Sequence, residues 1–431
     1  MNKLNNIDKF FIIALLVAVF FLRYVKLMFV LWYIPELIVL GYVCYQLVYK
    51  KRFLTRFNNL DRYIKIWAIF SLGFLSFIIG LNIYKFGIGV VFFENILMTF
   101  MPSIMLVYFI YLATLYSYEI LYEVGEKILR FLNIYFWINT PIIILQFFTG
   151  TFMMKRFLSW GNYDFDHMTG LIGPFGTGIL NVFWVVLLIG NLFFYFMTKR
   201  KSWLASFIIQ IPVMFVLSYF NENKSIIPTV ILFLFIFIGF SILIRGFTMK
   251  VALRFGLIIS IGLIGCIILY FTVGSFNELV DKMALLAYQL YYGIADPHNE
   301  RAYLNYLAFN NYDARHLGAG INTVEFNNQD IHPNLGINSM SLLLIHGGKW
   351  YLLAVINFYT TLAVLAVKKN FDRNTVIVYF VFLIIFSFLT IITQPFREHY
   401  IVAILAFLSL FVFLFYKHQM KENKQINTGV H

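Results

Sequence analysis

Apolar runs of about the length that crosses a bilayer follow one another through most of this chain. A helix needs about 20 apolar residues to cross the hydrocarbon core, and because backbone polar groups cannot bond to water there, the crossing segments must be helical or form a closed barrel. The runs predict an all-α integral membrane protein with about 12 transmembrane helices. The candidate spans lie at residues 7–22, 27–49, 64–83, 96–117, 128–148, 178–197, 203–220, 226–244, 255–273, 336–367, 375–393 and 399–416.

The composition agrees with this class of protein. Only 12% of the residues are charged and 61% are hydrophobic, whereas an ordinary soluble domain is about 25% charged. We expect residues 1–431 to form a single polytopic membrane domain. Cys44 and Cys266 both lie in apolar runs, so they predict neither a disulfide framework nor a metal site. No small-residue cleavage site follows the first run, which we interpret as a retained span and not as a signal peptide.

The net charge of +13 raises the possibility of a nucleic-acid partner, but its distribution argues otherwise. When the predicted spans alternate across the membrane, the basic clusters at 50–56, 199–201, 245–254, 368–373 and 417–424 all fall on one side. Lys and Arg are retained on the cytoplasmic side of short loops. The excess charge therefore predicts topology, with both termini cytoplasmic, and we expect no nucleic-acid partner.

Two connections on the opposite, external side are longer than the others. The first covers about residues 149–177, and the second covers residues 274–335, between the ninth and tenth spans. A connection of that size is uncommon without a role of its own. Apolar residues from Phe276 to Leu290 recur at steps of three and four, which predicts an amphipathic helix on the membrane surface. Asp296 followed by Pro297 predicts the start of a second helix.

The tenth span is too long for one crossing and is interrupted by Gly347 and Gly348. We expect a half-helix, from Ile337 to His346, that enters from the external side and turns at the glycines before 349–367 crosses. Broken helices are tolerated at membrane depth where they are buried in protein or line a cavity.

Several arginines lie on the predicted external side, where the positive-inside rule disfavours them. They therefore suggest an anion-binding site. A guanidinium group can hold a phosphate with two parallel hydrogen bonds. The candidate diphosphate-binding residues are Arg301, Arg315, Arg397 and Lys224, the last in a short turn between two spans. The alternative is that these side chains contact lipid head groups or pair with nearby acids such as Glu300, Asp313 and Glu398.

Histidines near the external face are candidate general bases, because imidazole titrates near neutral pH. His332 is the first candidate, with His346 or Asp313 as alternatives, since the two histidines flank the expected half-helix. Each histidine can also be a solvated polar residue with no role in chemistry. The chain has no phosphate-binding loop, paired metal-ligand set or nucleophile motif, so no metal and no cofactor is predicted.

Four local motifs, in this order, resemble those of the superfamily of O-antigen polymerases and ligases, especially the capsular and O-antigen repeat-unit polymerases (Wzy). The glycine-rich entry into the sixth span is one motif, and a Lys-Ser turn stands where the family has Ser-Arg. The others are Arg301 with a glycine-containing motif in the large loop, and a re-entering element whose position 337 is isoleucine and not histidine. The motifs are GPFGTGILN at 173–181, SYFNENKSIIP at 218–228, HLGAGIN at 316–322 and NSMSLLLIHGG at 338–348.

The resemblance implies a fold like that of class C glycosyltransferases and an enzyme of the bacterial cytoplasmic (inner) membrane with an extracytoplasmic active site. It implies a polymerase that joins oligosaccharide repeat units carried on undecaprenyl diphosphate into capsular or O-antigen polysaccharide. Implied partners are the lipid-linked oligosaccharide, membrane lipids, a flippase and chain-length regulator proteins. Two other functions stay open, namely an O-antigen or glycan ligase and a non-enzymatic flippase of lipid-linked oligosaccharide.

Overall fold

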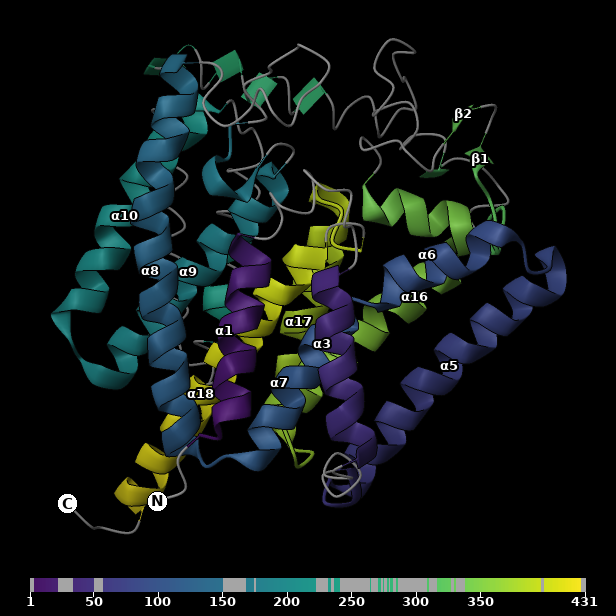
Figure 1. Ribbon diagram of the computed structural model, residues 1–431, viewed down its shortest axis with the longest axis horizontal. Coiled ribbons are helices and arrows are strands. Elements are labelled where there is room, and N and C mark those ends of the chain that lie inside the picture. Colours follow the sequence, from purple (N-terminus) through teal and green to yellow (C-terminus); the bar gives the residue numbers. More distant parts are fainter. Residues whose placement is uncertain are drawn as a thin grey trace.

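The chain folds as a bundle of membrane-length helices (Figure 1). The computed structural model describes residues 4–21, 34–49, 57–149, 168–173, 176–221, 232–233, 236–240, 264, 270–272, 274, 277–278, 280–281, 284–285, 308–309, 316–326, 329–330, 338–396 and 399–427. Within these ranges, eight segments are long and apolar enough to cross a membrane. By length and composition the protein is therefore a multi-pass membrane protein, and the elements of its described part are helical apart from one pair of two-residue strands.

The helices keep the order that the apolar runs predict. They are α1 Asn6–Phe20, α3 Ile34–Cys44 with the π-helical turn η1 Tyr45–Tyr49, α5 Arg62–Phe86, α6 Val90–Phe100, α7 Ser103–Leu115, α8 Tyr118–Thr149, α9 Thr177–Thr198, α10 Lys201–Phe220, α16 Ser339–Val367, α17 Arg373–Ile392 and α18 His399–Asn427. A 3₁₀ turn, η3, covers Gly170–Ile172, and the two-residue strands β1 Glu325–Phe326 and β2 Gln329–Asp330 pair in antiparallel fashion.

Eight of the predicted spans correspond to the membrane-length segments, and the other four do not. Helix α1 has 15 residues and is shorter than a full crossing. Of the predicted span 27–49, residues 34–49 are described, and they include the apolar helical stretch Leu37–Val48. The runs 226–244 and 255–273 lie largely outside the described residues. A total of about 12 spans, and the likeness to class C glycosyltransferases, stay predictions.

The fourth span differs from the single helix that we expected. It begins at Val90 and consists of two helices, α6 and α7, with Met101 and Pro102 between them. Proline lacks the N–H that would continue the helical ladder, which explains why the helix is interrupted here. Neither α6 nor α7 alone is long enough to cross a membrane, and the two together, Val90–Leu115, form one membrane-length segment (Figure 1).

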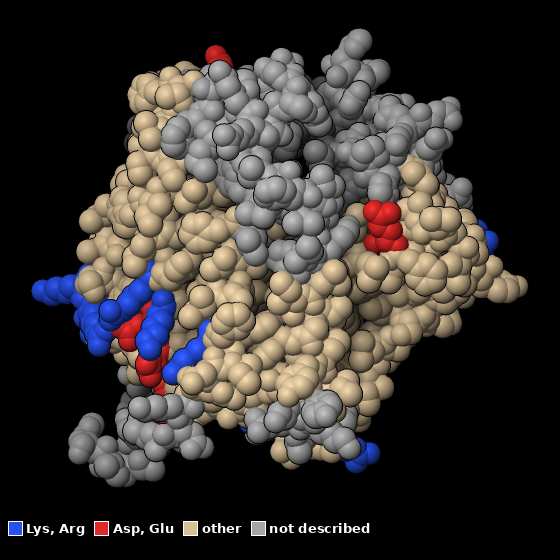
Figure 2. Space-filling view, in the orientation of Figure 1, with Lys and Arg blue, Asp and Glu red and all other residues tan. Residues whose placement is uncertain are grey.

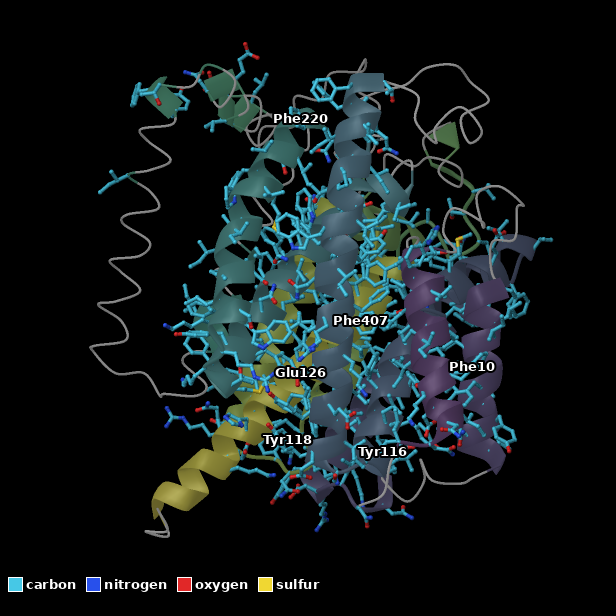
Figure 3. The ribbon with its side chains drawn as sticks, turned by 60° about the vertical axis from the view of Figure 1, so that its left-hand side comes forward. Phe10, Tyr116, Tyr118, Glu126, Phe220 and Phe407 are labelled. Atoms are coloured by element: carbon cyan, nitrogen blue, oxygen red, sulfur yellow. The ribbon has the colours of Figure 1, made fainter. Side chains whose placement is uncertain are left out.

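Burial separates a central pair of helices from peripheral ones. In the most apolar window of α18, 89% of residues are buried, and the value for α9 is 83%, against 28% for α5 and α10. Phe407 of α18 lies inside the bundle, whereas Phe10 of α1 points outward and is 70% exposed (Figure 3). In a bilayer an outward apolar side chain contacts lipid, so the exposed faces of α1, α5 and α10 are expected there.

Polar side chains join the helices inside the bundle. Asn133 of α8, Asn191 of α9 and Gln210 of α10 form a closed amide triad with donor–acceptor distances of 2.7–3.1 Å. Asn357 of α16 donates to Ser71 of α5 and accepts from Tyr379 of α17. Since lipid tails are as apolar as leucine, such bonds help to select one packing of the helices over others.

Charge marks one end of the bundle. Helix α1 begins and α18 ends at the same end, which we call the terminal end; the other is the distal end (Figure 1). Glu126 of α8 pairs with Arg130 and with Arg200, and Lys421 of α18 pairs with Glu119. Figure 2 shows this group of mixed charge at the lower left. Among the described lysines and arginines, all except Lys85 and Lys349 lie toward the terminal end.

The buried Lys368 lies in the connection between α16 and α17, at the terminal end, and forms hydrogen bonds across it. The Nζ of Lys368, whose side chain is 3% exposed, lies 2.7 Å from Asp372 Oδ2 and 2.6 Å from the Tyr416 hydroxyl. Burial lowers the pKa of Lys368. Although burial opposes it, hydrogen bonds from Lys368 and Thr375 hold the pKa of Asp372 below its ordinary value. Asp372 is also the N-cap of α17, in a capping box with Thr375.

We expect Lys368→Met to lower the free energy of unfolding by about 1–2 kcal/mol. Breaking a buried pair costs about 3–5 kcal/mol, but Asp372 is 41% exposed and water screens it, and the cost of burying the charged Lys368 offsets part of the gain from the pair. Because the pKa of Asp372 is lowered on folding, the stability from this pair is present at neutral pH and is lost as the pH falls below about 4. Thermal unfolding in detergent at several pH values would measure both effects. If the free energies of unfolding of the wild type and Lys368→Met differ by as much at pH 3 as at neutral pH, this account is wrong.

Candidate functional site at the break in α16

Helix α16 consists of two parts that meet at Gly348, as the paired glycines predicted. Gly348 has φ 70° and ψ −170°, which is not a helical conformation. The first part, Ser339–Gly347, lies across the distal end of the bundle, and the second runs toward the terminal end (Figure 1). We call the first part the half-helix. Its first turn is capped by Asn338, whose side chain accepts from the Ser341 N–H at 2.8 Å, and Ser339 N–H donates to the Thr393 carbonyl at 3.1 Å.

The carboxyl end of the half-helix is capped by a segment from the large loop. The last carbonyls of a helix have no partner within it. Here the Ala319 N–H donates to the Ile345 carbonyl at 2.7 Å, and the side-chain amide of Asn82, from α5, donates to the His346 carbonyl at 3.1 Å. The capping segment is His316–Asn322, the glycine-containing motif of the sequence, and we call it the docked segment.

Glycines allow the docked segment and the half-helix to approach closely. Gly318 has φ 70°, and a Cβ there would lie 2.5 Å from the Ile345 carbonyl oxygen. A Cβ on Gly348 would lie 2.1 Å from the carbonyl oxygen of His316. Real side chains do not make such contacts, and the positive φ values are those that glycine adopts without steric cost. The two glycine-containing motifs therefore meet, backbone against backbone.

Asparagine side chains fix the docked segment to the hairpin of α5 and α6. Asn82 accepts from the Ile321 N–H at 2.9 Å, and Asn95 of α6 donates to the Ile321 carbonyl at 2.7 Å. Asn322 accepts from the Gly89 N–H at 3.0 Å and donates to the Gly87 carbonyl at 2.9 Å. The buried N–H and C=O of Ile321 are thus both paired, as buried backbone groups require.

A narrow pocket adjoins the half-helix. Its walls come from α6, from the half-helix and from the connection between α17 and α18, and the lining residues are Asn95, Met98, Thr99, Ser339, Leu342, Leu343, His346 and Phe396. His346 is 3% exposed, so this histidine is enclosed and is not a solvated surface residue. The pocket is about large enough for one water molecule, and it places an imidazole, the commonest general base in enzymes, beside amide and hydroxyl groups.

Of the predicted site residues, the structure describes His346. Six others, His332, Asp313, Arg301, Arg315, Arg397 and Lys224, lie outside the described residues, as does the expected helix at 296. Parts of the expected amphipathic stripe, at 277–278, 280–281 and 284–285, are helical.

Chain neighbours of two predicted arginines lie at opposite ends of the half-helix. His316 directly follows Arg315, and its carbonyl faces Gly348. Phe396 directly precedes Arg397, and its N–H lies 3.5 Å from Ser339 Oγ. A half-helix of this length spans about 12 Å. The described neighbours of these two arginines, His316 and Phe396, therefore contact the two ends of the element that carries His346.

The sequence analysis did not single out the asparagines that build this site. Asn82 and Asn95 are 1% and 5% exposed, respectively, and each stands in an apolar run. A polar group inside such a run must find a partner, because burying it unpaired costs several kcal/mol. That rule is the signal that could have identified them. It also applies to Asp8 of α1, which is 2% exposed and accepts from the hydroxyls of Tyr42 and Tyr116.

The end of the first long loop is held in a similar way. Gly170, with φ 67°, donates its N–H to Gln146 at 2.8 Å, and Leu171 donates to Asn139 at 2.6 Å. Both amide side chains come from α8. A Cβ on Gly170 would lie 2.1 Å from Asn139 Oδ1. The 3₁₀ turn that precedes the glycine-rich entry to α9 and the docked segment are thus both held by amide side chains that bond to the backbone.

The described part of the chain holds no cluster of three or more histidine, cysteine, aspartate or glutamate residues that could bind a metal ion. Comparison with protein-family models, with curated proteins and with solved structures finds no match to this chain.

Proposed function

We propose that this protein is a membrane glycosyltransferase that polymerises oligosaccharide repeat units carried on a polyprenyl (undecaprenyl) diphosphate. The observation that carries the proposal is the insertion of the docked segment into the break of α16, beside the pocket that His346 lines. Irregular backbone at membrane depth is tolerated where it is buried in protein or lines a cavity, and transporters place their substrate sites at such broken helices. The residue before the docked segment is Arg315.

The charge distribution supports an external site. The described basic residues gather at the terminal end, which the positive-inside rule assigns to the cytoplasm. The break in α16 then faces the external side of the bacterial cytoplasmic membrane. The diphosphate of a lipid-linked sugar lies at that depth, because its lipid is held in the bilayer. Arginines near this end would meet the charge of that group.

The proposed reaction needs charge neutralisation, orientation and the removal of one proton. A hydroxyl oxygen of the acceptor unit forms a bond to the anomeric carbon of the donor chain, and the bond from that carbon to the diphosphate breaks. The lipid diphosphate leaves with the electron pair, and the acceptor proton passes to a base. Arg301, Arg315, Arg397 and Lys224 are the candidate residues for the diphosphate, and His346, His332 or Asp313 for the proton.

Reconstitution tests this function and separates it from its rivals. Purified protein in liposomes would be given a radiolabelled, lipid-linked repeat unit, and the products would be separated by size. We expect a ladder of polymer. Transfer of single chains to a different acceptor would indicate a ligase, and movement of the unit across the bilayer without a new bond would indicate a flippase. Either of these outcomes, without a ladder, would overturn the proposal.

In the same assay, we expect Arg301→Ala to reduce kcat/KM by about 10- to 150-fold. This is the loss that corresponds to one hydrogen bond to a charged group, about 1.5–3 kcal/mol. The matched control is Lys85→Ala, since Lys85 is an exposed cation near the distal end of α5, and this change should alter the rate less than twofold. Equal rates for Arg301→Ala and the wild type would remove Arg301 from the site.

A further inference from the structure

Asn82 occupies a position at which three parts of the chain meet. It lies near the distal end of α5 and is 1% exposed. Its Nδ2 donates to the Leu317 carbonyl at 3.3 Å and to the His346 carbonyl at 3.1 Å, while its Oδ1 accepts from the Ile321 N–H at 2.9 Å. One side chain thus contacts the beginning and the end of the docked segment and the end of the half-helix.

The other amides in this region connect fewer parts. Asn95 binds the docked segment to α6, and Asn322 binds it to the connection between α5 and α6. These bonds hold the segment to the hairpin. The bond from Asn82 to the His346 carbonyl also joins the half-helix to the hairpin. A primary amide suits this position, because it offers two donors and an acceptor at fixed angles.

We infer that Asn82 is a positioning residue that sets the register of the docked segment against the half-helix, and so places His346 and the chain that follows Arg315 relative to each other. The structural part of this inference stands on the hydrogen bonds of Asn82. Its consequence for catalysis rests on the proposed function. Misplacing reacting groups by about 1 Å can reduce a rate about 100-fold, so the register of the two elements matters for activity.

Electron paramagnetic resonance tests the structural part without any assay of activity. In a background with Cys44→Ser and Cys266→Ser, spin labels would be placed at Val324, which follows the docked segment, and at Ile66 on α5. These positions are 38% and 53% exposed. The wild type should give one narrow distance distribution, and Asn82→Leu a broad one. Asn357→Leu is the control, because Asn357 also joins α16 to α5 but bonds to Ser71.

Asn82→Asp adds a readout that a general loss of stability would not give. A protonated carboxyl can donate one bond and accept another, whereas a carboxylate can only accept and would face the carbonyl oxygens of Leu317 and His346. We expect a narrow distribution at about pH 4.5 that becomes broad at about pH 8 in this variant, with no such change in the wild type. A narrow distribution for Asn82→Leu, or the same distribution at both pH values for Asn82→Asp, would overturn the inference.

Activity then separates this inference from the proposed function. If the wild type polymerises lipid-linked units, Asn82→Leu should lower kcat about 10- to 100-fold with KM within about twofold, and Asn82→Asp should regain rate as the pH falls. If the wild type makes no polymer but the spin-label results hold, the proposed function fails and the positioning role stands. If the wild type is active and Asn82→Leu matches it, the catalytic consequence is wrong.

Discussion

Gly348→Ala is expected to lower the free energy of unfolding by about 2–6 kcal/mol and to displace the docked segment from the break in α16. Two costs add. A residue other than glycine at φ 70°, ψ −170° costs about 1–3 kcal/mol in backbone strain. The new Cβ would also lie 2.1 Å from the carbonyl oxygen of His316, and relieving such overpacking costs about 1–3 kcal/mol more.

Thermal unfolding of the purified protein in detergent, followed by tryptophan fluorescence, measures the first effect, and the spin-label pair at Val324 and Ile66 measures the second. Gly80→Ala is the matched control. Gly80 lies within α5 and has nothing within 4 Å of its Cβ position, so alanine should stabilise the helix by about 0.5–1 kcal/mol. A Gly348→Ala protein that unfolds at the wild-type temperature, with a narrow distance distribution, would show that the close contact is not needed.

The sequence was informative about features that depend on local pattern. Apolar length predicted the spans from α5 to α10 and from α16 to α18, because crossing a bilayer imposes a length on each helix. The paired glycines predicted the break in α16 at the correct place. The interruption between α6 and α7 was missed, although Pro102 marks it, because the apolar run continues through the proline and hydropathy alone does not register a missing N–H.

Contacts between residues that are far apart in the chain could not be predicted from local sequence pattern. Asn82 and Ile321 are 239 positions apart in the chain, and Asn82 and His346 are 264 apart. The local sequence around Asn82 predicts that its buried amide must have a hydrogen-bond partner. It does not predict which backbone groups those partners are. The same limit applies to His346. Its place before the glycines was evident, but the enclosed pocket formed with α6 and Phe396 depends on the packing of three elements.

That pocket gives the strongest prediction about chemistry. On the proposed function, we expect His346→Ala to lower kcat for polymerisation about 100- to 10,000-fold, which is the usual contribution of a positioned general base. The reason is geometric. His346 is 3% exposed and lines an enclosed pocket with Asn95, Thr99 and Ser339, and on the proposed function the acceptor hydroxyl would enter this pocket beside the imidazole. His346→Gln, which keeps a hydrogen-bonding side chain but cannot act as the base, should be nearly as slow.

The experiment must distinguish a loss of proton transfer from a loss of folding. It must also include the other candidate bases, His332 and Asp313. Both His346 variants should bind the lipid-linked substrate with KM within about threefold of the wild type, and His346→Gln should keep its unfolding temperature. Parallel assays of His332→Ala and Asp313→Ala decide the assignment. If either reduces kcat about 100-fold or more while His346→Gln remains active, proton transfer takes place in the large loop. In that case the enclosed imidazole serves to hold the half-helix beside the docked segment.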